Sequence, residues 1–161
     1  MLGFVRIPEE RLKIFEKRGY LKKLEELVNC KIKVDEEISI ECEDPLLLLR
    51  VKEVVKAFGR GFSFDDALNL LDEEYFLETV NIKDFSGKSK SRFFQIKGRV
   101  IGSEGKAKKL IEKYTNVKIA IYGKTVSIIG KWDDVQRAKQ AVESLLMGRK
   151  HGTVFRNLTE V

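Results

Sequence analysis

The stretch KGRVIGSEGKAKKLIEKYTNVKI, Lys97–Ile119, decides the fold of this chain and points to its chemistry. Its second half has the apolar periodicity of an amphipathic helix that begins near Lys106. Gly102 and Gly105 stand just before that helix, where the first backbone amides lack intrahelical acceptors and carry positive dipole character. Because glycine has no Cβ, it allows another backbone to come very close. The stretch therefore predicts a binding site for a phosphate backbone at the start of the helix.

A basic helix face and the order of the following segments support this interpretation. Lys106, Lys109 and Lys113 share one side of the predicted helix, and Ala107 and Leu110 lie on the other. A G-x-x-G motif alone is weak evidence. Here the helix is followed by an alternating strand, a glycine-containing turn, a second strand and a long helix. That order matches the K-homology (KH) module, in which a GXXG loop clamps about four nucleotides of a single strand.

The same pattern occurs twice in the chain, in Arg18–Phe58 and in Glu104–Leu146. Each segment begins with a lysine-rich helix that ends near an asparagine, Asn29 or Asn116. A short alternating strand follows, KIKV or KIAI, and then a turn, a second strand, ISIE or VSII, and a long helix. The repeat predicts two copies of one supersecondary unit.

Each repeat follows an apolar segment that we expect to be a strand, GFVRI at Gly3–Ile7 and FFQIK at Phe93–Lys97. With these segments, each unit has the order strand, helix, helix, strand, strand, helix. The sequence therefore predicts an α+β fold of two tandem type I KH domains (β-α-α-β-β-α). Each domain is expected to have a three-stranded antiparallel sheet covered by helices on one face.

We expect four segments along the chain: a KH-like domain over 1–58, a connector over 59–92 packed on both domains, a KH domain over 93–147, and a C-terminal tail over 148–161. Ser63 and Asp66 resemble a capping box that opens a short helix in the connector. The glycine- and serine-rich Ser86–Ser91 is the best linker candidate. The basic tail is expected either to pack on the sheet or to contact RNA.

Charge divides the chain as clearly as the repeat does. Residues 1–80 contain 13 Lys and Arg against 18 Asp and Glu, and residues 81–161 contain 18 against 7. The first half therefore carries −5 and the second +11, within a net charge of +6. A basic half suits a polyanion such as nucleic acid, whereas an acidic half does not.

Several classes of protein are disfavoured by what the sequence lacks. No apolar run approaches the ~20 residues of a membrane span, and the N-terminus MLGFVRIPEE lacks the regions of a signal peptide. We therefore expect a cytoplasmic protein with no membrane association. Cys30 and Cys42 have no metal-binding spacing, and His151 is the one histidine, so we expect two reduced thiols, no metal and no cofactor.

Catalytic motifs are also absent, and we expect no enzymatic activity. Gly87-Lys88-Ser89 and Gly123-Lys124-Thr125 resemble the end of a phosphate-binding loop. That loop requires a glycine five positions earlier, where the chain has Ile82 and Lys118. The paired carboxylates at Asp133-Asp134 are explained by a position at the start of a helix. Lys124 is expected to lie in an exposed turn near RNA.

The predicted RNA-binding residues come from the loop, its flanking helices and the following hairpin. They are Lys97, Gly98, Arg99, Val100, Ile101, Gly102, Ser103, Glu104, Gly105, Lys106, Lys109, Lys113, Lys118, Ile119 and Lys124. Alternation places Ile119 and Ile121 on one face of a strand, where they either line the groove beside the loop or belong to the core. If that face is buried, Ile101 is the best apolar residue for the groove. No catalytic or metal-binding residue is predicted.

Three further segments, GRGFS (Gly59–Ser63), YGKTVSIIG (Tyr122–Gly130) and HGTVF (His151–Phe155), extend the resemblance beyond the module. With the two KH units, they resemble the archaeal and eukaryotic small-subunit assembly factors known as partner-of-Nob proteins. The resemblance covers nearly the whole chain. It implies binding to single-stranded pre-rRNA near the 3′ end of the small-subunit rRNA. It also implies cooperation with the Nob endonuclease and, in archaea, contact with the alpha subunit of initiation factor two.

Two departures from the family pattern affect the expected function. Ser103 stands where the family usually has a basic residue after the first glycine of the second loop, which weakens one phosphate contact. In the first unit the corresponding segment is FEKRG, Phe15–Gly19, where Phe15 or Glu16 replaces the first glycine. We therefore expect the first unit to serve structure or protein contacts and the second to bind RNA. The alternatives are a KH protein-interaction scaffold and a translation-factor-associated RNA-binding adaptor.

Overall fold

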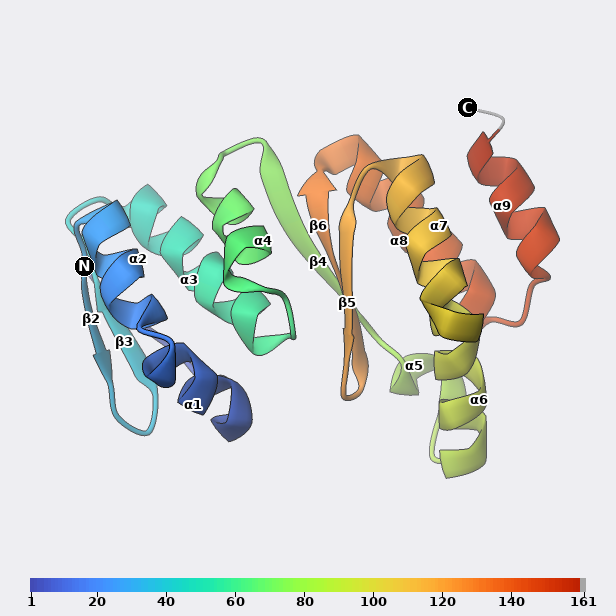
Figure 1. The fold of residues 1–161 in the computed structure, drawn as a ribbon, viewed down its shortest axis with the longest axis horizontal. Coiled ribbons are helices and arrows are strands. Elements are labelled where there is room, and N and C mark those ends of the chain that lie inside the picture. Colours follow the sequence, from blue (N-terminus) through green and yellow to red (C-terminus); the bar gives the residue numbers. More distant parts are fainter. Residues whose placement is uncertain (160–161) are drawn as a thin grey trace. The chain divides into compact units, whose positions relative to one another are not determined.

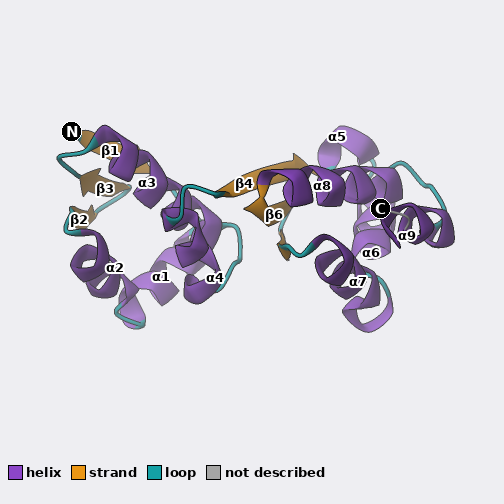
Figure 2. Cartoon of the chain, turned by 90° about the horizontal axis from the view of Figure 1, so that it is seen from above, coloured by secondary structure: helices purple, strands orange, loops and turns teal. Residues whose placement is uncertain are grey.

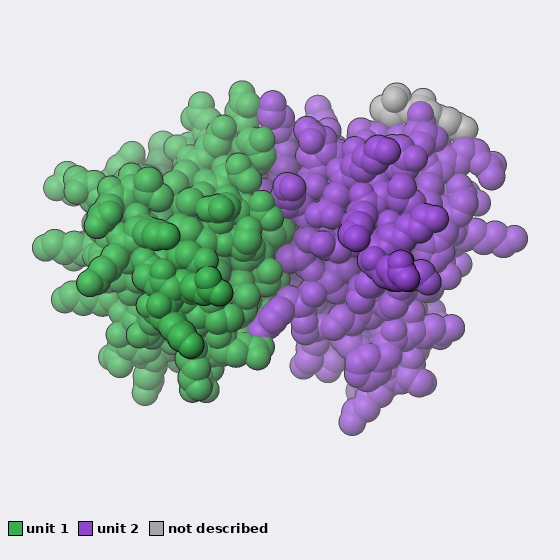
Figure 3. Space-filling view, in the orientation of Figure 1, with its two compact units in different colours: residues 1–75 green, residues 76–161 purple. Residues whose placement is uncertain are grey.

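The computed structural model describes residues 1–159 and divides the chain into two compact units, Met1–Tyr75 and Phe76–Val161. Figure 3 colours the two units separately. Each unit has its own sheet and its own buried side chains.

The first unit contains one strand, two helices, two strands, a long helix and a short helical segment (Figure 1). Their bounds are β1 Leu2–Val5, α1 Glu9–Lys17, α2 Tyr20–Val28, β2 Lys31–Val34, β3 Ile38–Glu41, α3 Pro45–Gly59, α4 Phe64–Leu68 and a 3-10 turn at Asn69–Leu71. The Asp44 side chain accepts a hydrogen bond from the Leu46 amide, and Pro45 occupies the first position of α3. The Ser63 side chain caps α4 in the same way, through the Asp66 amide.

The second unit repeats the same six elements and adds two helices. Their bounds are β4 Tyr75–Asn81, α5 Lys83–Ser86, α6 Lys90–Ile101, a 3-10 turn at Ser103–Gly105, α7 Lys106–Thr115, β5 Lys118–Tyr122, β6 Thr125–Lys131, α8 Trp132–Leu146 and α9 His151–Thr159. Asn116 ends α7 in the left-handed conformation, as Asn29 ends α2, so both repeats turn from helix to strand by the same device.

The two sheets have the same topology, with strand orders β1-β3-β2 and β4-β6-β5. The hairpins are antiparallel, with Lys31 opposite Glu41 in the first unit and Lys118 opposite Ile129 in the second. In each unit the helices lie on one side of the sheet (Figure 2). The predicted fold, two α+β units of the KH order, is confirmed.

The first strand of the second unit is not the segment that was predicted from the sequence. Phe93–Lys97, predicted as a strand, lies inside α6, and β4 at Tyr75–Asn81 is the strand that neighbours β6. Ile96 and Val100 are buried four residues apart, which is the spacing of one helix face. The predicted connector 59–92 is therefore not a separate segment, because its residues are divided between the two units. The linker expected at Ser86–Ser91 joins α5 to α6 within the second unit.

The prediction of two reduced thiols is also wrong, because Cys30 and Cys42 form a disulfide with a Cα–Cα distance of 4.8 Å. Cys30 precedes β2 and Cys42 follows β3, whose paired ends are Lys31 and Glu41. The hairpin register therefore places the two cysteines opposite each other, one step beyond that pair. The spacing of cysteines along a sequence can indicate a metal site. It does not reveal that two cysteines lie opposite each other on paired strands.

The C-terminal tail forms α9 over its described part, up to Thr159. α9 packs against α7 and α8, and buries Val154 and Leu158 in the core of the second unit. The tail thus packs on helices rather than on the sheet; Glu160 and Val161, also part of the predicted tail, lie outside the described residues. Within residues 1–159, no helix is long and apolar enough to cross a membrane.

Candidate nucleic-acid interface

The GSEG loop, Gly102 to Gly105, joins α6 to α7 and depends on its first glycine for its shape. Gly102 has φ 75° and ψ 171°, a conformation that is essentially restricted to glycine. A Cβ on Gly102 would lie 2.6 Å from the Ala107 amide nitrogen and 2.8 Å from the Ala107 Cβ. The close approach that requires glycine here is therefore made by the protein's own helix α7.

The second glycine leaves the start of α7 open. Gly105 is left-handed, with φ 75° and ψ 15°, and its amide donates to the Gly102 carbonyl at 3.1 Å. Glu104 is also left-handed, with φ 55°. No described side chain caps α7, and a Cβ on Gly105 would meet only the Lys109 Cε, at 3.9 Å. The helix N-terminus thus presents its positive end at an uncrowded surface, which suits a phosphate.

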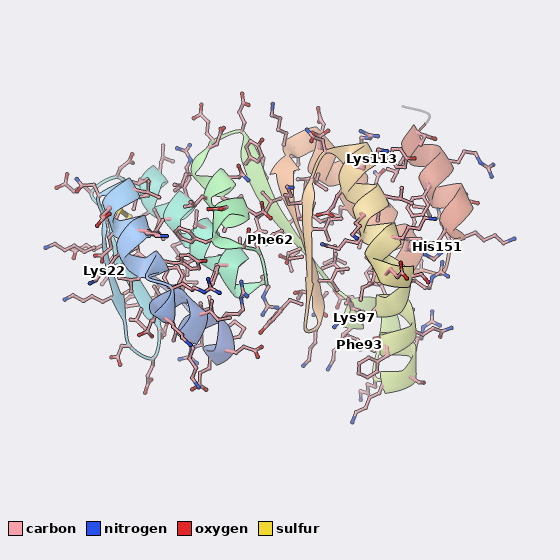
Figure 4. All side chains as sticks on the ribbon, viewed as in Figure 1. Lys22, Phe62, Phe93, Lys97, Lys113 and His151 are labelled. Atoms are coloured by element: carbon pink, nitrogen blue, oxygen red, sulfur yellow. A yellow bond between two sulfur atoms is a disulfide. The ribbon has the colours of Figure 1, made fainter. Side chains whose placement is uncertain are left out.

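Lysines follow this helix start along α7. Lys106, Lys109 and Lys113 are exposed along α7, and Figure 4 labels Lys113. Lys108 lies on the side that faces β5, because its ammonium is 3.8 Å from Glu112, whose carboxylate accepts from the Ile119 amide at 2.9 Å. Lys108 is not among the residues predicted from the sequence, although its i,i+4 spacing from Glu112 indicates an ion pair on this side of the helix.

Strand β5 is an edge strand of the second sheet, with β6 as its neighbour. The Ile119 amide points away from β6, since it donates to Glu112 on α7. By the alternation of an antiparallel strand, the amide and carbonyl of Ile121, two residues along, face away from β6 as well. The Lys97 ammonium on α6 donates to the Gly123 carbonyl, in the turn after β5, at 2.8 Å. Ile101 is half-buried at the end of α6.

Three predicted contact residues have other positions than expected. Val100 and Ile119 are buried in the core of the second unit, and Ile121 packs against that core. The Arg99 guanidinium donates to the carbonyls of Leu145, at 2.9 Å, and Arg149, near the end of α8. The side chains of Val100, Ile119 and Arg99, which were predicted to contact RNA, therefore stabilise the packing of the second unit. Of the remaining predicted residues, Lys106, Lys109, Lys118 and Lys124 are exposed.

The loop of the first unit lacks this architecture. Gly19 is left-handed and donates to the Glu16 carbonyl at 3.1 Å, as Gly105 donates to Gly102. Glu16 therefore occupies the position of the first glycine and carries a carboxylate there. Arg18, just before Gly19, is helical with φ −82°, whereas Glu104 is left-handed. Phe15 is fully buried, with its ring 5.3 Å from that of Phe58.

The fold and this loop together define a type I KH domain, and comparison with known proteins identifies its family. A family model for the second KH domain of PNO1, described as a eukaryotic type KH-domain (KH-domain type I), matches residues 76–161. The KH domain-containing protein MJ0443 of Methanocaldococcus jannaschii is 36% identical over 98% of this chain and 72% of its own length. The pre-rRNA-processing protein PNO1 of Eremothecium gossypii is 34% identical over 73% of this chain and 45% of its own.

Comparison with solved structures points to the same family of KH-domain proteins. Dim2p of Pyrococcus horikoshii superposes with a TM-score of 0.91 and 34% identity, covering 100% of this chain and 99% of that one. A structure from the same organism, described as an a/eIF2alpha-aDim2p-rRNA complex, contains a chain that matches with a TM-score of 0.89 and 34% identity, over 99% and 93% of the two chains. This chain belongs to the PNO1/Dim2 family of KH-domain proteins. It spans about half the length of the E. gossypii relative.

Proposed function

We propose that the second unit binds single-stranded RNA through the GSEG loop and that the protein acts in assembly of the small ribosomal subunit. The observation that carries the proposal is the open N-terminus of α7, which begins at a left-handed Gly105 and has the exposed Lys106 and Lys109 in its first turn. The strand's phosphates lie against the α7 amides and lysines, and its bases lie in the groove toward Ile101 and β5.

The names of the relatives indicate which RNA and which protein partner this chain would bind. PNO1 of E. gossypii is named a pre-rRNA-processing protein, and the P. horikoshii complex joins aDim2p with a/eIF2alpha and rRNA. The RNA of this chain is then small-subunit pre-rRNA, near its 3′ end, and its partners are the alpha subunit of initiation factor two and a Nob-type endonuclease. The protein acts without catalysis of its own.

The first unit serves structure or protein contacts. Glu16 adds a carboxylate to the first loop at the position of the first glycine, and residues 1–80 carry a net charge of −5. Both features repel an RNA backbone. If this assignment is right, the Lys17→Glu and Arg18→Glu variants of the first loop leave RNA affinity unchanged, while Lys106→Glu in the second loop lowers it.

Fluorescence anisotropy with a single-stranded oligonucleotide from the 3′ end of small-subunit rRNA tests the function. We expect tighter binding of this strand than of the same strand in a duplex. The log of the binding constant should fall with log salt by ~0.7 for each phosphate contacted. Equal affinity for the duplex, or binding insensitive to salt, would contradict a GXXG-type site. A scrambled strand of equal length measures how much sequence contributes.

A further inference from the structure

The two Gly-Lys-Ser/Thr fragments that do not form phosphate-binding loops meet at one cleft of the second unit. Gly87-Lys88-Ser89 precedes α6, and Gly123-Lys124 lies in the turn between β5 and β6. The cleft has a volume of about 600 Å³. Its lining residues are Lys83, Gly87, Lys88, Ser89, Lys90, Phe93, Phe94, Lys97, Gly123 and Lys124. We call it the lysine cleft.

Five lysines surround the lysine cleft, and no carboxylate is among the described residues that line it. Asp84, the acid next to Lys83 on α5, is exposed but is not a lining residue. The Ile82 amide donates to the Lys124 carbonyl at 2.8 Å and thereby holds α5 against the turn. A hydrogen bond from Lys124 and the charge of its ammonium lower the pKa of Lys83. Such crowding of like charges marks a place where an anion would be stabilised.

An aromatic surface adjoins these lysines. Phe94 is 68% exposed, although phenylalanine is a residue that folding normally buries. The Phe93 and Phe94 rings meet edge to face, with centroids 5.3 Å apart. The Lys97 ammonium lies 5.7 Å from the centre of the Phe93 ring while it donates to Gly123 (Figure 4). Cations beside an exposed ring are the combination that proteins use to hold an unpaired nucleotide.

We propose that the lysine cleft binds a further nucleotide of the RNA strand held at the GSEG loop, with its base stacked on Phe94 and its phosphate among Lys83, Lys88 and Lys124. This inference rests on the proposed function and extends its footprint. Helix α6 connects the two sites, and the distance along it from Phe93 to Gly102 is about 13 Å. Lys97 lies between them on α6, so the path between the two sites passes one further cation.

RNA fits this cleft better than an acidic protein segment does. An acidic peptide would satisfy the lysines but would gain little from the face of an exposed phenylalanine. A nucleotide uses both, because stacking on an aromatic ring is tolerant of sequence and the phosphate neutralises the ammonium groups. The nearby KH loop, which clamps about four nucleotides, also brings a strand to this region.

The test compares two oligonucleotides of single-stranded RNA on the full chain. The short one has about four nucleotides, enough for the GSEG groove, and the long one has about ten. The cleft variant combines Lys83→Gln, Lys88→Gln and Phe94→Ser. A matched control makes the same changes on exposed residues of the first unit, Lys22→Gln, Lys31→Gln and Leu27→Ser, where Leu27 is 62% exposed. Circular dichroism verifies that both variants are folded.

We expect the cleft variant to bind the short RNA like the wild type and the long RNA about tenfold more weakly. The salt slope for the long RNA should fall by ~0.7, the contribution of the one phosphate placed in the lysine cleft. The control should match the wild type for both. Ultraviolet crosslinking should join the long RNA, but not the short one, to the peptide that contains Phe94.

Unchanged binding of the long RNA by the cleft variant would overturn this inference while leaving the GSEG site intact. An equal loss for both lengths would overturn it too, since that result reflects overall charge. Loss of binding to polyglutamate without loss of the long RNA would assign the cleft to an acidic protein instead. Failure of the wild type to bind either RNA would reject the proposed function and this extension together.

Discussion

The backbone amide of Ala107 lies where a side chain on Gly102 would have to begin. A Cβ built on Gly102 comes within 2.6 Å of that nitrogen, and the backbone there has φ 75° and ψ 171°. Gly102 thus lets the start of α7 fold back against the end of α6. The first glycine of the loop is required by the fold itself, and the second, Gly105, governs access to the helix start.

Replacing Gly102 should therefore destabilise the second unit. We expect Gly102→Ala to lower its free energy of unfolding by about 3 kcal/mol, through backbone strain and the contact with Ala107. Trp132 is the one tryptophan of the chain and belongs to this unit, so its fluorescence during urea unfolding measures the change. Gly98→Ala is the control, because Gly98 lies within α6 with open space around its Cβ position. It should raise stability by about 0.5–1 kcal/mol; equal effects of the two changes would contradict the account.

Adding a cation to the loop should strengthen RNA binding. Ser103 is exposed beside the open start of α7, and Ser103→Lys supplies a charge within reach of the bound phosphates. We expect a several-fold gain in affinity and a salt slope larger by ~0.7 for one added phosphate contact. Anisotropy titrations at several salt concentrations measure both. Ser103→Gln, with similar length and no charge, should show neither gain, and a gain of equal size would exclude the electrostatic explanation.

Most of the fold was predictable because the two repeats have the same types of residue at the ends of their helices and in their hairpins. The left-handed Asn29 and Asn116, the hairpins and the Asp44-Pro45 helix start all follow from residue type and spacing. The opening strand of the second unit was not predictable in the same way. Phe93–Lys97 is a short apolar cluster that suits strand or helix, and the cap at Ser89 together with burial of Ile96 and Val100 decides for the helix.

The disulfide should stabilise the first unit. Cys30 and Cys42 enclose a short loop, and closing a loop of this size contributes about 3 kcal/mol. Reduction of the wild type should therefore lower the urea midpoint of the first unit, observed as loss of helical circular dichroism without a change at Trp132. The Cys30→Ser, Cys42→Ser variant should not respond to reductant. Titration of two free thiols in the unfolded, unreduced protein would contradict the bond.

Lys83 should react faster with acylating reagents than it would without Lys124 beside it. The neighbouring Lys124 lowers the pKa of Lys83, so at a mildly alkaline pH a larger fraction of Lys83 is unprotonated and nucleophilic. Lys124→Gln removes the ammonium and should slow acylation of Lys83, as measured by peptide mass spectrometry. Long RNA should slow it as well, because a phosphate favours the protonated form. Faster labelling in the presence of RNA would count against a phosphate at the lysine cleft.

The candidate site could be predicted only in part. The GSEG loop is visible in the sequence because the glycines and lysines are contiguous. Arg99 was misjudged because its carbonyl partner, Leu145, is 46 residues away. The lysine cleft combines Lys88 with Lys124, from segments that are joined only when β4 and α5 bring the start of α6 to the β5–β6 turn. Long-range contacts of this kind have no local signature.

The most direct test of the central claim, that a phosphate backbone binds at the start of α7, compares Gly105→Asp with Gly105→Asn. Both side chains tolerate the left-handed conformation of Gly105, and they differ mainly in charge. Dissociation constants for a short single-stranded RNA should rise at least tenfold more for Gly105→Asp than for Gly105→Asn, because the carboxylate occupies the place of a phosphate. Equal affinities of the two variants would show that the strand does not pass over the start of α7.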